Sequence, residues 1–170
     1  GATVAVDTDA HRELAERLAT RGTVLLENDG VLPLSEEADV AVLGPNVDEA
    51  VLGGGGSSET TPVVERAPAD AIAERARGDV ETVHGLPRVE GISLLDHITG
   101  AVDHEPEGAV ALDAAERAAA DADVAIVFVR DVTTEAKDRG SLALPGRQDE
   151  LIRTVADANS RTVVVLNTSG

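Results

Sequence analysis

The sequence predicts an α/β domain: a layered sandwich in which helices flank a mainly parallel sheet. Short runs rich in valine have apolar residues at successive positions, which is typical of strands buried on both faces. Between these runs lie stretches whose apolar residues recur at helical spacing. The chain has 170 residues, 42% of them hydrophobic, which is enough for one core of ordinary size.

The first predicted elements are a helix and a short strand. Apolar residues recur at helical spacing from Asp9 to Arg21, with Asp9 as the predicted N-cap and Gly22 as the predicted stop. Residues 23–26 are a threonine, a valine and two leucines, and this run predicts a strand. The turn residues at 28–30 would end that strand.

Apolar runs and helical stretches alternate along the rest of the chain. The apolar runs predict four strands of a parallel sheet, at 40–43, 80–83, 124–129 and 162–166. Helical spacing predicts three helices, at 69–77, 112–122 and 146–158, the last with Pro145 at its first turn. The least regular region, 87–106, is expected to be a surface excursion around one short helix at 93–98.

The charge of the chain is strongly negative. With 14 Lys+Arg against 32 Asp+Glu the formal net charge is −18, which excludes a nucleic-acid binder because a phosphate backbone requires a basic face. Lys137 is the only lysine and Phe128 the only aromatic residue. An excess of acid with almost no lysine indicates the surface of a protein from a high-salt organism. An acidic protein from a high-GC genome is the alternative.

Several classes of site are excluded by residue type and spacing. The absence of cysteine excludes disulfides, thiolate zinc sites and a cysteine nucleophile. The four histidines have no metal-like spacing, so we expect neither a metal nor a cofactor. No stretch is long enough to span a membrane and none has the layout of a signal peptide. The compartment therefore stays open between the cytoplasm and secretion.

Three polar segments follow predicted strands, at the end where ligands collect in a parallel sheet. They are a glycine run at 53–58, a long loop at 130–144 that contains Glu135, and residues 167–170. If their strands are parallel, all three segments lie at one edge of the sheet. The glycine run lacks the lysine of a P-loop, which argues against a nucleotide site. A glycine turn that binds no ligand is the alternative to a binding role for this run. For Glu135 the alternative is an ordinary solvated loop glutamate.

Several segments match, in order, the motifs of one family. TVLLENDGVLPL at 23–34, VLGPN at 42–46 and GGGSS at 54–58 are three of them. The most specific is EAKDR at 135–139 together with LALPGRQDELI at 142–152. The chain thus resembles the C-terminal α/β-sandwich domain of glycoside hydrolase family 3, the β-glucosidase and β-xylosidase group. Residues 1–170 would be a partial copy of that domain, incomplete at the C-terminal end, and the family's N-terminal barrel would be its partner.

The resemblance implies a retaining, exo-acting β-glycosidase that hydrolyses terminal β-glucosides or β-xylosides. Glu135 would be the general acid/base, and the aspartate nucleophile would belong to the barrel domain. The fragment alone would then be inactive. Five further residues would bind the carbohydrate substrate or hold the Glu135 loop beside it: Gly56, Ser57, Ser58, Asp138 and Arg139.

Two other hypotheses remain. A non-catalytic carbohydrate-binding or scaffold domain of the same fold is favoured by Ala136, which stands where the family usually has a glycine. The spacing of Glu135, Asp138 and Arg139 favours the enzyme. An unrelated doubly wound binding domain would require the family-like segments to be coincidental.

Overall fold

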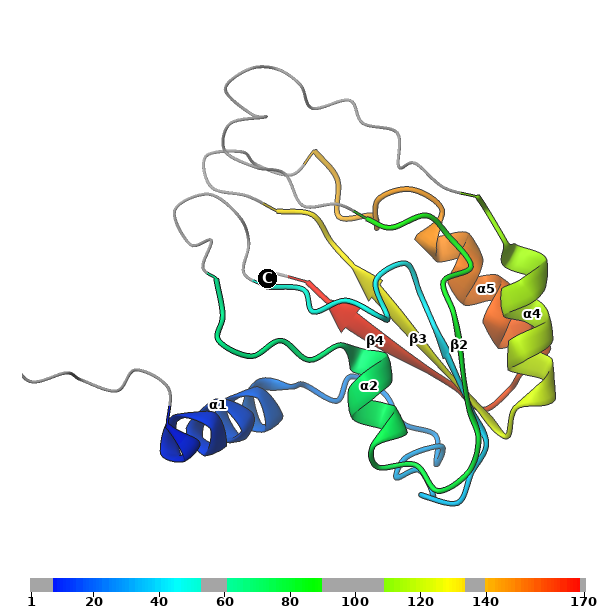
Figure 1. The fold of residues 1–170 in the computed structure, drawn as a ribbon. Coiled ribbons are helices and arrows are strands. Elements are labelled where there is room, and N and C mark those ends of the chain that lie inside the picture. Colours follow the sequence, from blue (N-terminus) through cyan, green and yellow to red (C-terminus); the bar gives the residue numbers. More distant parts are fainter. Residues whose placement is uncertain (1–7, 53–60, 90–108, 134–139, 169–170) are drawn as a thin grey trace, which may run out of the picture. The chain divides into compact units, whose positions relative to one another are not determined.

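The computed structural model describes residues 8–52, 61–89, 109–133 and 140–168. The chain divides into two compact units, residues 1–33 and residues 34–170. The first contains helix α1 (Asp9–Gly22), and the second contains the sheet and all other described helices (Figure 1).

The second unit is built on a four-stranded parallel sheet with the strand order β2-β1-β3-β4. The strands are β1 (Val40–Leu43), β2 (Val80–Val83), β3 (Val124–Arg130) and β4 (Thr162–Asn167). In register, Val40 of β1 lies between Val80 of β2 and Val124 of β3. The four predicted strands of this unit and their parallel direction are confirmed.

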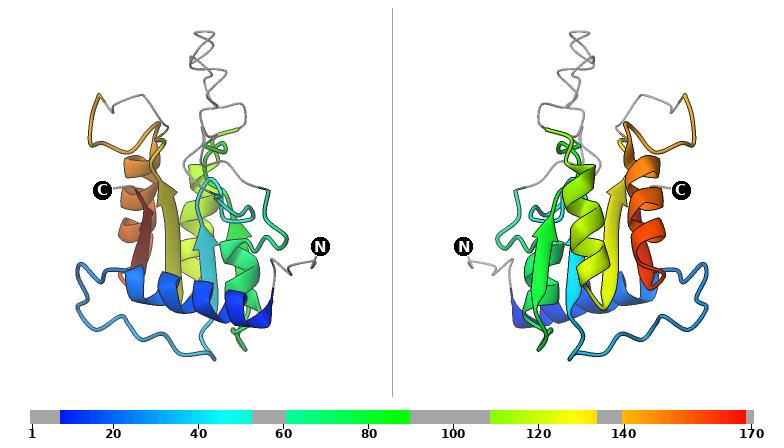
Figure 2. Two further views of the ribbon diagram at one scale, coloured as in Figure 1. Left: turned by 90° about the vertical axis from the view of Figure 1, so that its left-hand side faces the viewer. Right: turned by 90° about the vertical axis from the view of Figure 1, so that its right-hand side faces the viewer.

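Helices cover both faces of the sheet. Helices α4 (Leu112–Asp121) and α5 (Gln148–Ala158) pack on one face, and the short helix α2 (Pro68–Ala73) packs on the other (Figure 2). The predicted α/β fold class is therefore correct. The two faces of β1 and β3 are both buried, which explains why their residues are apolar without alternation.

The core follows the alternation of side chains along the strands. Ala41, Leu43 and Val127 face α4 and α5, whereas Val42 and Ile126 face α2. The central strands are almost entirely buried, while the edge strands β2 and β4 are half-buried or exposed. The weaker apolar pattern of residues 80–83 is thus a consequence of their position at an edge.

Two helix boundaries differ from the prediction by more than one residue. Helix α2 ends at Ala73 rather than at Arg77, because the backbone N–H of Arg77 donates to Glu36 at 2.6 Å instead of to a helical carbonyl. Helix α5 begins at Gln148, because Gly146 has a φ of 67°, which a right-handed helix excludes. Pro145 therefore precedes the helix and does not lie in its first turn.

The start of the chain corrects two further predictions. The N-cap of α1 is Thr8, not Asp9, and the Thr8 hydroxyl accepts a hydrogen bond from the backbone N–H of His11 at 3.2 Å. The expected strand at 23–26 is wrong. Leu26 is 80% exposed, and no described strand pairs with these residues. A β-branched run becomes a strand only where a neighbour supplies ladder hydrogen bonds. The predicted turn at 28–30 is present, with the side-chain oxygen Oδ1 of Asn28 accepting from the Gly30 N–H.

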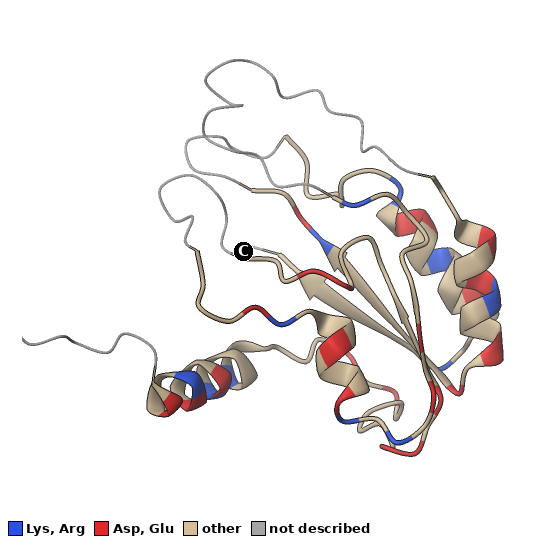
Figure 3. Ribbon diagram, viewed as in Figure 1, with Lys and Arg blue, Asp and Glu red and all other residues tan. Residues whose placement is uncertain are grey.

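Acidic residues are spread over the helices and turns of the sheet unit, whereas β1, β3 and β4 contain none (Figure 3). At a net charge of −18 these carboxylates repel one another. The screening length shrinks from about 10 Å at 0.1 M salt to about 3 Å at 1 M. We expect the melting temperature to rise steeply between low salt and molar KCl.

Thermal unfolding followed by circular dichroism measures this effect. Sucrose serves as the control, because it stabilises compact states without screening charge. A melting temperature that stays flat from low salt to molar KCl would contradict both the repulsion argument and the high-salt interpretation of the composition.

Candidate functional site

The carboxyl ends of β1, β3 and β4 lie at the same edge of the sheet, since all three strands are parallel. This confirms the arrangement on which the predicted common edge depends. The predicted site residues themselves lie outside the described residues: Glu135, Asp138, Arg139, Gly56, Ser57 and Ser58. Their roles stay predictions. Of the three predicted segments, the structure describes residues 130–133 and 140–144 of the loop after β3, together with Asn167, which ends β4, and Thr168, which follows it.

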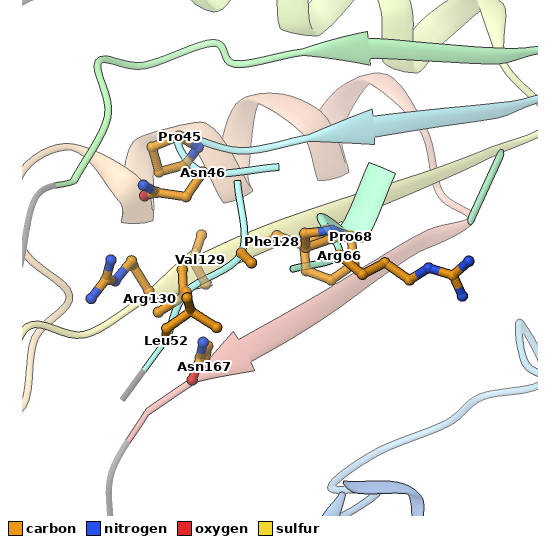
Figure 4. Close-up of a pocket in the computed structure, with 11 residues that line it drawn as sticks. Pro45, Asn46, Leu52, Arg66, Pro68, Phe128, Val129, Arg130 and Asn167 are labelled. Atoms are coloured by element: carbon orange, nitrogen blue, oxygen red, sulfur yellow. The ribbon is translucent and has the colours of Figure 1, made fainter. Parts of the chain in front are cut away.

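A pocket with a volume of about 280 Å³ opens at this edge (Figure 4). It is lined by the turn after β1, the residues before and at the start of α2, and the ends of β3 and β4. Most lining residues are apolar, among them Leu52 and Phe128. The polar residues that line it are Asn46, Arg66, Arg130 and Asn167. Amide and guanidinium groups at an apolar pocket can orient a ligand that bears hydroxyl groups.

The turn after β1 is held close to the neighbouring strands. Gly44 has a φ of 138°, and its N–H donates to Val83 at 3.2 Å. The Asn46 side chain is only 8% exposed. Its carbonyl oxygen accepts from the Val89 N–H at 3.2 Å, and its amide donates to Glu49 at 3.3 Å. Asn46 thereby joins the turn after β1 to the segment after β2.

A cluster of charged side chains supports the same turn. The Arg88 guanidinium contacts Asp48 at 2.6 Å and Glu49 at 3.0 Å. The Nε2 atom of His84 lies 2.9 Å from Oδ1 of Asp48. Partial burial by itself would raise the pKa of Asp48, but the neighbouring His84 and Arg88 outweigh it, so this pKa lies below its ordinary value.

The lowered pKa of Asp48 makes its contribution to stability pH-dependent. A carboxyl whose pKa is lower in the folded than in the unfolded state stabilises the fold above the unfolded pKa, about 3.9 for aspartate. The contribution is lost as the pH falls through the folded pKa. We expect Asp48→Asn to lower the free energy of unfolding at pH 7. The loss should be no more than about 1 kcal/mol, because the Asp48 and Arg88 side chains are both exposed.

The difference between Asp48→Asn and the wild type should shrink as the pH falls below about 4. Urea unfolding at a series of pH values measures it. Asp157→Asn is the control, since it removes the same charge from the exposed surface of α5. A difference that is as large at pH 3 as at pH 7 would contradict the assigned cause.

Arg130 is the last residue of β3 and was not among the predicted site residues. Its guanidinium is half-buried and donates to the carbonyl oxygens of Val89 and Asp131, each at 3.3 Å. Burial lowers the pKa of Arg130, while the carboxylates of Glu49 and Asp131 raise it in part. The sequence signal was a cation at the end of an apolar strand. Arg130 places a partly desolvated positive charge at the pocket.

Gln148, the first residue of α5, was also missed, although it belongs to the segment that carried the family resemblance. Its side chain is 1% exposed and makes three hydrogen bonds to backbone groups. The sequence signal was a polar residue two positions after Pro145-Gly146, near a predicted helix start.

Metal and membrane sites receive no support from the described part of the chain. Within it, no three or more His, Asp or Glu side chains come together as metal ligands would. The helices in those same ranges are all too short or too polar to cross a lipid bilayer.

Comparison with known proteins identifies a family. The model of the glycosyl hydrolase family 3 C-terminal domain matches residues 23–170. Thermostable beta-glucosidase B of Acetivibrio thermocellus is 34% identical over 164 residues, which are 94% of this chain and 20% of that protein. Beta-D-xylosidase 1 of Arabidopsis thaliana is 32% identical over 173 residues, 97% of this chain and 20% of its own length.

An exo-alpha-(1->6)-L-arabinopyranosidase of Bifidobacterium longum is 33% identical over 175 residues, 95% of this chain and 21% of its own. The chain thus spans about a fifth of the length of the curated relatives it matches. Among solved structures, the GH3 beta-glucosidase of Bifidobacterium adolescentis has a TM-score of 0.74 at 32% identity, covering 95% of this chain and 22% of that one.

Proposed function

The chain belongs to glycosyl hydrolase family 3, whose C-terminal domain it matches, and from this premise we propose that it is part of a retaining, exo-acting β-glycosidase. Its partner is an N-terminal barrel domain, and its substrates are terminal β-glucosides or β-xylosides. The names of two relatives, a beta-glucosidase and a beta-xylosidase, support this class of substrate.

The observation that carries the proposal is the common edge of β1, β3 and β4 with its pocket. Glu135 belongs to the connection that leaves β3, and the glycine run to the connection that leaves β1. The amide of Asn46 and the guanidinium of Arg130 line the pocket at the same ends. This edge therefore supports a site for a ligand rich in hydroxyl groups.

In the proposed reaction Glu135 acts twice. It first gives its proton to the glycosidic oxygen while an aspartate of the barrel attacks the anomeric carbon, which releases the aglycone alcohol. A covalent glycosyl-enzyme results. The Glu135 carboxylate then takes a proton from water, whose oxygen displaces the aspartate and releases the sugar. Asp138 and Arg139 hold the loop of Glu135, and Gly56, Ser57 and Ser58 wall the sugar site.

The domain requirement is tested with the 170-residue chain alone and with the protein that carries this chain together with its barrel (the two-domain protein). We expect the chain alone to show no turnover of an aryl β-glucoside, because the nucleophile is missing. The two-domain protein should hydrolyse it. Robust turnover by the chain alone would contradict the two-domain assignment, and an inactive two-domain protein would contradict the proposed reaction.

A second candidate function is a non-catalytic carbohydrate-binding domain of the same fold. Ala136, which stands where the family usually has a glycine, favours it. In that case replacing Glu135 would leave the hydrolysis rate of the two-domain protein unchanged, so the same substitution distinguishes the two functions.

A further inference from the structure

The end of β3 extends beyond its neighbour β1. Strand β1 ends at Leu43, which lies opposite Val127, whereas β3 continues to Arg130. On the other side, β4 accompanies β3 to its end, with Asn167 opposite Arg130. The last residues of β3 therefore lack a strand on the β1 side within the described sheet.

The backbone N–H and C=O of Arg130 are among the groups at this end that have no partner in β1. In a parallel strand the N–H and C=O of alternate residues face alternate neighbours. The N–H of Val124 donates to Asp39 on the β1 side at 3.2 Å, and that of Ala125 donates to Arg161 on the β4 side at 3.1 Å. Arg130 has the parity of Val124, so its N–H and C=O face the side where β1 has ended.

The side chain of Gln148 occupies the position that a longer β1 would fill. Its carbonyl oxygen accepts from the Arg130 N–H at 2.9 Å, and its amide donates to the Arg130 carbonyl at 2.8 Å. A primary amide can imitate a neighbouring strand because it offers the same donor and acceptor as a peptide group. Its second N–H donates to the Pro145 carbonyl at 3.0 Å.

These three bonds connect the two ends of one segment. Arg130 is the residue at which the chain leaves β3, and Pro145 precedes α5 by three positions. With Gln148 only 1% exposed, water does not readily replace its bonds. One buried amide thus fixes both the departure and the return of the connection between β3 and α5.

We propose that Gln148 is a positioning residue for catalytic proton transfer: by joining Arg130 to Pro145 it fixes the base of the β3–α5 connection and thereby orients the general acid/base. The proposal rests on the proposed function, because Glu135 belongs to this connection. Gln148 itself acts on backbone groups only and takes no part in the reaction.

The test uses Gln148→Met in the two-domain protein, which keeps the length of the side chain and removes all three bonds. We expect kcat/KM for an alkyl β-glucoside, whose leaving group requires protonation, to fall at least tenfold. For 2,4-dinitrophenyl β-glucoside, whose leaving group departs without a proton, the fall should be less than threefold. A displaced general acid predicts this dependence on the leaving group, and a mere loss of folded protein does not.

The matched control is Val155→Ala, which opens a small cavity at a fully buried position of the same helix. It should lower the melting temperature and leave the ratio of the two substrates unchanged. If Gln148→Met does not fold, Gln148→Glu keeps the length and the acceptor but offers at most one donor in place of two, and the same leaving-group dependence is expected. Equal losses on both substrates, or none, would overturn the proposal.

Two further measurements separate the possible failures. If Glu135→Gln shows the leaving-group dependence and the Gln148 variants do not, only the positioning role fails. If Glu135→Gln leaves the hydrolysis of both substrates unchanged, the proposed function fails. In the unmodified 170-residue chain, hydrogen exchange at the Arg130 amide should be as slow as at Val127 in the strand interior. Exchange at the rate of an exposed amide would contradict the bond on which the proposal depends.

Discussion

Replacing Glu135 by glutamine in the two-domain protein is expected to slow the hydrolysis of an alkyl β-glucoside by a factor of about 100 to 10,000. Glutamine has nearly the size of glutamate, but its amide can neither protonate the glycosidic oxygen nor deprotonate water. The leaving group of an alkyl glucoside cannot depart without a proton, so kcat/KM for this substrate should fall by the whole of this factor.

With 2,4-dinitrophenyl β-glucoside the first step needs little acid assistance, so the slow step of the Glu135→Gln variant becomes hydrolysis of the glycosyl-enzyme. Azide should then restore turnover, because it attacks the anomeric carbon without general-base help and leaves as β-glucosyl azide. Steady-state kinetics with both substrates, with and without azide, and identification of that product measure the effect.

The control is Glu116→Gln, which removes the same charge from an exposed position of α4. It should leave both substrates unaffected. Unchanged kinetics in Glu135→Gln would assign the acid/base role to another residue, or favour the non-catalytic function that Ala136 suggests. A loss that is equal for both leaving groups would indicate damage to folding rather than to proton transfer.

The sheet could be predicted from sequence because its central strands are buried on both faces. At 40–43 and 124–129 burial requires apolar residues at every position, and few other structures produce such a run. Residues 23–26 have a similar composition but no described neighbouring strand. Composition records a preference for strand, whereas pairing depends on what lies beside the segment, which a single sequence does not contain.

Helix ends were harder to predict, because they depend on a contact with a residue distant in sequence or on the backbone conformation of a single residue. The backbone N–H of Arg77 donates to the carbonyl of Glu36, about 40 positions away in sequence, and α2 ends before this point. At α5 the positive φ of Gly146 moves the start to Gln148. Neither cause changes the apolar spacing from which the helices were predicted.

Part of the candidate site could be predicted from the sequence and part could not. The edge of the sheet followed from the order of strands and helices, because parallel strands place their carboxyl ends together. Gln148 and Arg130 could not be selected, since their importance arises from the different lengths of β1 and β3. A sequence shows that a glutamine lies two positions after Pro-Gly, but only the sheet shows that it lies beside a backbone residue with no partner in β1.

Gly44→Ala is expected to destabilise the sheet unit severely. A Cβ atom at Gly44 would lie 2.0 Å from the carbonyl oxygen of Phe128, and the φ of 138° disfavours any side chain. The obstacle is the backbone of β3, so the conflict is relieved only if β1 and β3 separate. We expect a loss of at least about 4 kcal/mol in the free energy of unfolding, a large part of the stability of an ordinary domain.

Gly146→Ala is the matched control for this prediction. Gly146 also has a positive φ, 67°, but an added Cβ would meet nothing within 4 Å. Its replacement adds backbone strain without a clash and should cost about 1–2 kcal/mol. Urea unfolding of both variants in molar KCl, where charge repulsion is screened, compares the two losses. The clash and the less favourable φ both make the Gly44 variant the worse of the two, so an equal loss in both variants would mean that the turn after β1 does not pass against Phe128, and the pocket would lose the wall that this turn provides.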